Sequence, residues 1–334
     1  MKRNNKEIIP WIDVIKGFGI LSVVIGHIFN GVVSHIMFIF HMPLFFFISG
    51  YLLKPTSEFS QYFKKKVVHL LIPYFCFLIP LYLFFTGLPP IALQSFLDYI
   101  TTILYGGVKL HGALGVFWFI TCLFLTQQTM NYLIVKLKTK ILILIISVIL
   151  VFSYINMVYF PNLYLPWNAH VVLASAPIFY LGFLFKNKNI KIKNSIFLLI
   201  GCSVMIFSYF YPENVYDMKT TNYGIPLVTL LSSIVLVLNL KIISIKLSNF
   251  KWPKLMFSEI GKASMVIMYL HQPIQFLTSS YISESPLFRF LITIIVSCLI
   301  YRIFLNFKIS RSLFLGSYQD FKKIQKCFLK KINI

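Results

Sequence analysis

Long apolar stretches recur along the whole chain and are separated by short polar segments. Each stretch holds about 18–22 residues, enough for a helix to cross a hydrocarbon core about 30 Å thick. We therefore expect an all-α polytopic membrane protein, built as a single bundle of about ten transmembrane helices. The expected spans lie near 12–33, 35–53, 70–87, 114–135, 141–158, 170–185, 194–211, 225–240, 263–283 and 287–306.

The composition agrees with this pattern. Hydrophobic residues make up 58% of the 334-residue chain and charged residues only 12%, whereas a soluble domain carries about 25% charged residues. Almost all cations fall on one side of the expected spans, and only Lys109, Lys219 and Arg289 fall on the other. This asymmetry follows the positive-inside rule and predicts cytoplasmic N- and C-termini. The net charge of +22 therefore reflects topology, and we expect membrane lipid, and no nucleic acid, as a partner.

The segment before the first span and the segment after every second span are predicted to be cytoplasmic. We expect residues 8–306 to form the transmembrane domain and residues 307–334 a basic cytoplasmic tail. From about 313 to 328 the tail alternates apolar residues with lysines, as in an amphipathic helix on an anionic inner leaflet. Cations on this side include Lys2, Arg3, Lys6, Lys54, Lys64, Lys65, Lys66, Lys136, Lys138, Lys140, Lys186, Lys188, Lys191, Lys193, Lys241, Lys246, Lys251, Lys254 and Lys262.

The first span carries polar residues that a lipid-facing helix normally excludes. Lys16 and His27 are almost three helical turns apart, so they share one face and are separated by about 16 Å along the axis. Asp13 precedes Lys16 by one turn, where its carboxylate can neutralise the ammonium. Ionisable residues inside a membrane usually mark a functional site. The alternative for Lys16 is a side chain that snorkels to the inner interface.

Further polar residues are expected near the outer end of the same bundle. His41 of the second span returns to about the depth of His27, and His271 of the ninth span lies near mid-depth. Trp118 opens the fourth span toward the outside. The residues predict a polar track that is cationic at the cytoplasmic end and rich in imidazole toward the other. The alternative is that each histidine is structural and bonds a backbone carbonyl.

These positions belong to five motifs that occur in one order along the chain. Together the motifs resemble acyltransferase family 3, the membrane-bound O-acyltransferases of cell-envelope glycans, and within it the fucose-O-acetylase-like subgroup. The motifs are WIDVIKG at 11–17 with VIGH at 24–27, FHMPLFFFISGYL at 40–52, FKKK at 63–66 leading into LLIPY at 70–74, WFI at 118–120, and GKAS at 261–264 with YLH at 269–271.

The resemblance implies a membrane enzyme that moves an acyl group from cytoplasmic acyl-CoA to a sugar hydroxyl of a surface or lipid-linked polysaccharide. We expect acetyl-CoA as the co-substrate, with no bound cofactor and no metal. His27 is the expected general base, or it carries the acyl group covalently. His41 would orient His27 or donate to the oxyanion, and Asp13 would keep Lys16 charged.

The resemblance also implies two binding regions. The basic stretch Lys64, Lys65 and Lys66 would bind the acyl-CoA phosphates, although ammonium groups lack the bidentate geometry of the arginines that the family often has there. Trp118, His271 and Ser49 would line the acceptor pocket.

Two other classes of function remain open at this point. A secondary transporter or flippase for polysaccharide intermediates would also have many helices and a polar track. A scaffolding subunit of an envelope assembly complex would use the histidines only for structure. In each case we expect a multi-pass protein of the bacterial cytoplasmic (inner) membrane, with envelope-biosynthesis proteins as partners.

Overall fold

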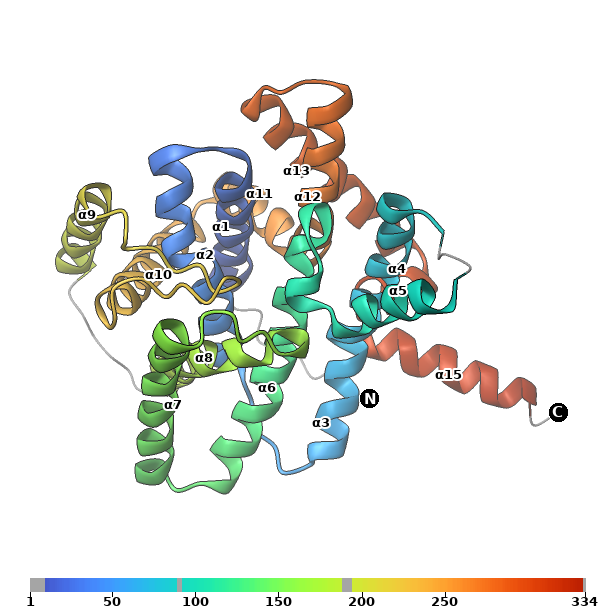
Figure 1. Ribbon diagram of the computed structural model, residues 1–334, viewed down its shortest axis with the longest axis horizontal. Helices are drawn as coiled ribbons and strands as arrows, with labels where there is room; N and C mark the ends of the chain where they lie inside the picture. The colour runs from blue at the N-terminus through green and yellow to red at the C-terminus, as the bar shows by residue number, and fades with distance from the viewer. Residues whose placement is uncertain (1–9, 89–91, 188–193, 333–334) are drawn as a thin grey trace.

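The computed structural model describes residues 10–88, 92–187 and 194–332, and within these ranges it contains helices and no strand. The helices gather in one bundle, and the last of them, α15, extends away from it (Figure 1). The predicted all-α class of a polytopic membrane protein is confirmed. The predicted cytoplasmic cations Lys2, Arg3, Lys6, Lys188, Lys191 and Lys193 lie outside the described residues.

The α-helices are α1 (Pro10–Ile28), α2 (Gly31–Leu52), α3 (Phe59–Lys66), α4 (Ile72–Thr86), α5 (Leu93–Tyr105), α6 (Trp118–Lys136), α7 (Thr139–Tyr159), α8 (Val172–Asn187), α9 (Asn194–Phe210), α10 (Val228–Leu247), α11 (Lys251–Lys262), α12 (Ser264–Tyr281), α13 (Pro286–Asn306), α14 (Lys308–Leu313) and α15 (Tyr318–Ile332). A π-helix, η1 (Val67–Leu71), joins α3 to α4, and three 3₁₀ segments, η2 (Gly107–Lys109), η3 (Gly112–Phe117) and η4 (Pro166–Val171), precede α6 and α8.

Eight of the described helical segments are long and apolar enough to cross a membrane. The predicted spans near 194–211 and 263–283 coincide with α9 and α12, which are not among the eight. α9 is shorter than the others, and α12 carries His271, Gln272 and Gln275 in its middle. Polar residues lower the hydropathy of a helix whether they face lipid or protein, so the count of about ten spans stays a prediction.

Glycine allows the helices of this bundle to approach closely. A Cβ atom at Gly50 of α2 would collide with the backbone carbonyl of Phe179 in α8, and one at Gly182 of α8 would collide with that of Phe47 in α2. Gly17 brings α1 against α11 in the same way. Small residues are the usual means by which membrane helices pack, because lipid gives no hydrophobic drive for helix association.

The third predicted span begins earlier than expected. The structure continues it back to Phe59, so one irregular helical segment runs over Phe59–Thr86. Pro73 explains the irregularity, because it has no N–H for the carbonyl of His69 and a π-turn forms at that point. The neighbouring carbonyl of Leu70 accepts a hydrogen bond from the hydroxyl of Tyr269, at 3.4 Å.

The first part of the C-terminal tail packs on the helix bundle, and only α15 extends away from the bundle (Figure 1). Arg311 of α14 donates to the carboxylate of Asp320 in α15, at 2.9 Å. Between these helices Gly316 adopts a φ of +62°, and a Cβ atom there would lie 2.5 Å from the carbonyl oxygen of His69. The helix predicted over about 313–328 therefore starts only at Tyr318, after this turn. Its position on an inner leaflet and the domain boundary at 306 stay predictions.

Candidate active site

Three imidazoles meet where α1, α2 and α12 pack together. The ring centroid of His27 lies 5.3 Å from that of His271 and 6.2 Å from that of His41. α1 contacts both α2 and α12, so His27 is the central member of the three (Figure 1). The structure therefore brings together the three histidines that the sequence placed in different spans.

Hydrogen bonds to the backbone orient two of these rings. Nδ1 of His41 lies 2.6 Å from the carbonyl oxygen of Met37, and Nδ1 of His271 lies 3.0 Å from that of Ile267 and 2.9 Å from that of Met268. A carbonyl only accepts, so Nδ1 is the donor in both rings, and in each neutral ring Nε2 then carries the lone pair. Both side chains are buried. The alternative that these histidines are purely structural accounts for the Nδ1 of each ring. The Nε2 of each ring remains available for another interaction.

His27 differs from its two neighbours. It is only half-buried, and none of the hydrogen bonds found among the described residues involves its ring. Phe38 packs edge-on against both His27 and His41, with centroids 5.4 and 4.8 Å away. His27 is held by ring contacts and keeps both nitrogens free for a ligand. No group of three or more described histidine, cysteine or acidic side chains is arranged to hold a metal ion.

The free side of His27 faces a cavity of about 180 Å³. Its wall includes His41 from α2, Trp118 from the start of α6, Gln272 from α12, and Lys219 from the segment between α9 and α10. Five separate parts of the chain therefore converge on one small hollow. Of the predicted site residues, His27, His41 and Trp118 line this cavity, and His271 lies against the ring of His27.

The segment 211–227 supplies one wall of this cavity, which the sequence pattern did not predict. It leaves α9 at the edge of the molecule and runs back toward the centre (Figure 1). Asn214, Tyr216 and Met218 are buried in alternation. Buried loops are unusual because their backbone groups need partners, so this segment is a fixed part of the cavity wall.

Lys219 projects from this segment into the cavity. Its ammonium donates to the carbonyl oxygen of Leu110, at 3.3 Å. Burial lowers the pKa of Lys219, and the nearby carboxylate of Asp217 opposes part of that change. A Cβ atom at Gly115 would lie 2.8 Å from the Lys219 Nζ, so the absence of a side chain there makes room for the ammonium.

One signal for this residue was present in the sequence. Lys219 is one of three cations that fall on the side that the positive-inside rule leaves poor in charge. Gln272 also had a signal, because it follows His271 directly. Neither signal shows that the two side chains face the same hollow.

The family model of the acyltransferase domain matches residues 9–304, which is most of the 334-residue chain. The chain belongs to acyltransferase family 3. The comparison with curated proteins gave no match, and the comparison with solved structures gave none either. The predicted family is confirmed, and the fucose-O-acetylase-like subgroup stays a prediction.

Lys16 and Asp13 of the acyltransferase lie away from its histidines. Their side chains pair at 3.4 Å, as their spacing predicts, and are 30% and 27% exposed. Neither lines the cavity at His27, and on a straight helix the separation of Lys16 from His27 is about 16 Å. The shared helix face therefore does not bring the lysine to the imidazole.

Ser49 also lies outside the cavity wall of the acyltransferase. Its hydroxyl is within 3.5 Å of Gln127 Nε2, which donates to it. This contact joins α2 to α6. The predicted place of Ser49 in an acceptor pocket stays a prediction.

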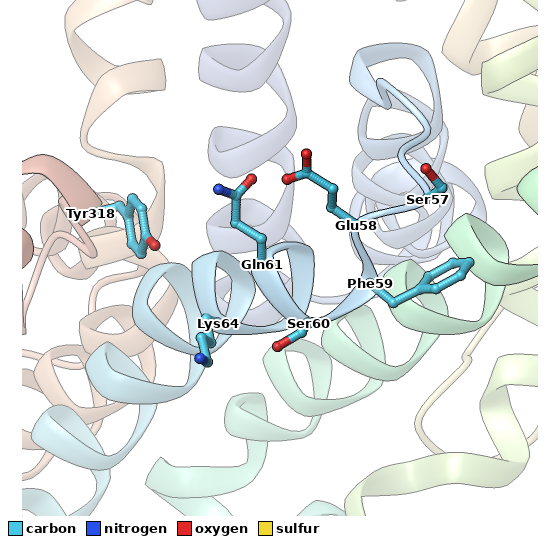
Figure 2. Close-up of a pocket in the computed structure, with 7 residues that line it drawn as sticks. All are labelled: Ser57, Glu58, Phe59, Ser60, Gln61, Lys64 and Tyr318. Carbon is cyan, nitrogen blue, oxygen red and sulfur yellow. The ribbon is translucent and has the colours of Figure 1, made fainter.

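The predicted acyl-CoA site borders a second, wider hollow of the acyltransferase, of about 660 Å³. Figure 2 shows Lys64 and Ser60 on one side of α3, Gln61 and Glu58 on the other, and Tyr318 of α15 facing this helix. This hollow shares no lining residue with the cavity at His27.

The three lysines of this stretch point to different surroundings. Lys64 lines the hollow, Lys65 donates to the side chain of Gln61 at 3.1 Å, and the ammonium of Lys66 lies 5.3 Å from the ring centre of Tyr62. Successive residues of an α-helix are rotated by about 100°, so three in a row cannot share one face. Only Lys64 is placed to meet a ligand in this hollow.

Proposed function

We propose that this membrane acyltransferase moves an acyl group, acetyl in the first instance, from cytoplasmic acyl-CoA to a sugar hydroxyl of a surface or lipid-linked polysaccharide. The observation that carries the proposal is the half-buried His27, which faces a cavity with both ring nitrogens free. The proposed setting is the inner membrane of a bacterium. Envelope-biosynthesis proteins are the proposed partners.

In this proposal His27 is the general base. The sugar hydroxyl attacks the carbonyl carbon of the thioester while His27 removes its proton, and a C–O bond forms as the C–S bond breaks. The proton then passes from His27 to the leaving thiolate. A positioned general base typically accounts for about 10²–10⁴ in rate. The lone pair on Nε2 of His41 or of His271 would accept the second N–H of a protonated His27 and so stabilise it.

The hollow beside Lys64 is the proposed site for the charged end of acyl-CoA. Its ammonium is exposed and can pair with a phosphate as a point charge. Glu58 in the same wall opposes an anion, so we expect weak binding of the nucleotide part.

The test of the proposed function compares the envelope glycans of cells with and without this gene by mass spectrometry. We expect the loss of one acyl mass increment per modified sugar on deletion, and its return on complementation. Identical glycan masses in the two strains would contradict the proposal. Full-length but unexported acylated glycan in the deletion strain would instead favour the transporter alternative.

Lys219 should contribute to transfer through its charge in the cavity. Replacing it with methionine keeps the length of the side chain but removes a donor from the wall of the cavity at His27. We expect the rate of labelled acetyl transfer by isolated membranes to fall about a hundredfold, as for loss of one oxyanion donor. The rate of Gly115→Ala should fall less, about tenfold, because the added methyl group only displaces the ammonium of Lys219. Equal rates in Lys219→Met and the wild type would show that the ammonium has no part in transfer.

A further inference from the structure

A directed chain of hydrogen bonds leads from α13 to the cavity at His27. Arg289 of α13 donates through Nη2 to the side-chain oxygen of Gln275 in α12. Gln275 in turn donates through Nε2 to the side-chain oxygen of Gln272, at 2.6 Å. Gln275 and Gln272 are 4% and 7% exposed, and Gln272 lines the cavity.

The direction of this chain follows from the chemistry of its first member. A guanidinium has only donors, so the atom of Gln275 that faces it must be the amide oxygen. The amide nitrogen of Gln275 must then face Gln272, and the atom of Gln272 that it meets must be an oxygen. This leaves the NH₂ group of Gln272 for the cavity. The orientation of both amides is thus set by Arg289 rather than by an arbitrary assignment of O and N.

Arg289 has no other evident task at this place. It is one of the few cations on the predicted outer side of the membrane, and its Nε is buried without a partner among the described residues. A guanidinium near apolar surroundings is costly. A guanidinium at this place has one clear effect: it fixes the orientation of the two glutamine amides, which a neutral side chain that can both donate and accept would leave free to flip.

We propose that Gln272 donates its side-chain NH₂ to the acyl carbonyl oxygen of the donor, and that Arg289 holds it in that orientation through Gln275. The inference rests on the proposed function. A thioester carbonyl oxygen only accepts hydrogen bonds, and it gains negative charge as the sugar oxygen bonds to the carbonyl carbon. A fixed donor beside His27 meets this need, whereas the sugar hydroxyl needs an acceptor, which His27 provides. Gln272 is then a catalytic residue, and Gln275 and Arg289 are positioning residues.

The first test reverses the direction of the hydrogen bond between Gln275 and Gln272 and keeps a polar side chain at each position. In Gln275→Glu the carboxylate accepts from Arg289 and also from Gln272, so Gln272 must turn its NH₂ inward and its oxygen toward the cavity. We expect the apparent kcat for transfer from labelled acetyl-CoA to native envelope glycan to fall about a hundredfold. The KM for acetyl-CoA should stay within about twofold, because the contact strengthens only in the transition state. Thr278→Val, which changes a buried side chain of the same helix outside the chain of bonds, should keep the wild-type rate.

A second pair of variants covers the case in which Gln275→Glu fails to accumulate in membranes. Lysine at position 289 still only donates, whereas glutamine can donate or accept. We therefore expect Arg289→Lys to keep most of the kcat and Arg289→Gln to lose most of it at equal abundance. A purely structural role would affect both by way of abundance and would not separate them in kcat.

The possible outcomes distinguish failure of the role of Gln272 from failure of the proposed acyltransferase function. Wild-type kcat in Gln275→Glu, or equal kcat in the two Arg289 variants, would overturn the role of Gln272 while the acyltransferase proposal stands. If wild-type membranes transfer no label to the glycan, the proposed function fails, and this inference fails with it.

Discussion

Replacing His27 with alanine should lower acyl transfer to the envelope glycan by a factor of about 10²–10⁴, the range for loss of a general base. The physical reason is that the two imidazoles beside His27 lack its freedom: His41 and His271 each commit Nδ1 to a backbone carbonyl. The measurement is the initial rate of labelled acetyl transfer from acetyl-CoA by isolated membranes. Membrane abundance of the variant should remain close to wild type, because His27 makes no hydrogen bond within the described residues.

The matched control for this variant is His111→Ala. His111 is an exposed histidine on the same predicted side of the membrane, and it does not line the cavity. We expect it to transfer acetyl at the wild-type rate. Near-normal transfer by His27→Ala would end the assignment of His27 as base. Normal acylation together with blocked export would favour a transporter.

Gly50→Ala should prevent the acyltransferase from accumulating in a folded form. The added methyl group would collide with the backbone carbonyl of Phe179, and a backbone atom cannot rotate aside as a side chain can. Because Gly182 makes the reciprocal approach to Phe47, α2 and α8 would have to separate along their contact. Overpacking costs about 1–3 kcal/mol where a core can adjust, and we expect about 3 kcal/mol or more here. The measurement is the amount of protein that stays monodisperse after extraction in mild detergent.

Gly26→Ala is the comparison for this variant. It adds the same methyl group to a neighbouring helix, but the nearest atom is the Cβ of Met37, at 3.3 Å. A side chain can shift by a few tenths of an ångström, so we expect most of the wild-type yield. Equal yields of the Gly50 and Gly26 variants would show that the contact between α2 and α8 is looser than the structure indicates.

Much of the fold could be predicted from the sequence because a membrane permits few solutions. Backbone groups in lipid must bond within their own segment, so each long apolar stretch becomes a helix. The helix before the span near 70–87 was not foreseen, because the polar run Lys64, Lys65 and Lys66 carries no apolar signal, and the segment starts at Phe59. The tail helix also began later than expected, because the turn at Gly316 is set by its contact with His69.

The candidate site was predictable only in part. Helical periodicity shows which residues share a face and roughly how deep they lie, and this was enough to group His27 with His41 and His271. Periodicity cannot show that a non-helical segment returns to the bundle, so Lys219 was counted as a loop cation. It did give the spacing of Lys16 and His27 along α1, about 16 Å on a straight helix, and the structure keeps Lys16 out of the cavity wall at His27.

The segment 211–227 gives the cavity one wall that does not belong to the helical framework. Alternate residues of this segment are buried, so single changes at the residues that line the cavity, such as Tyr216, would reshape the hollow and leave the glycine contacts of α2 with α8 untouched. The segment is therefore the place where the size of the cavity can be changed without altering the packing of the helices.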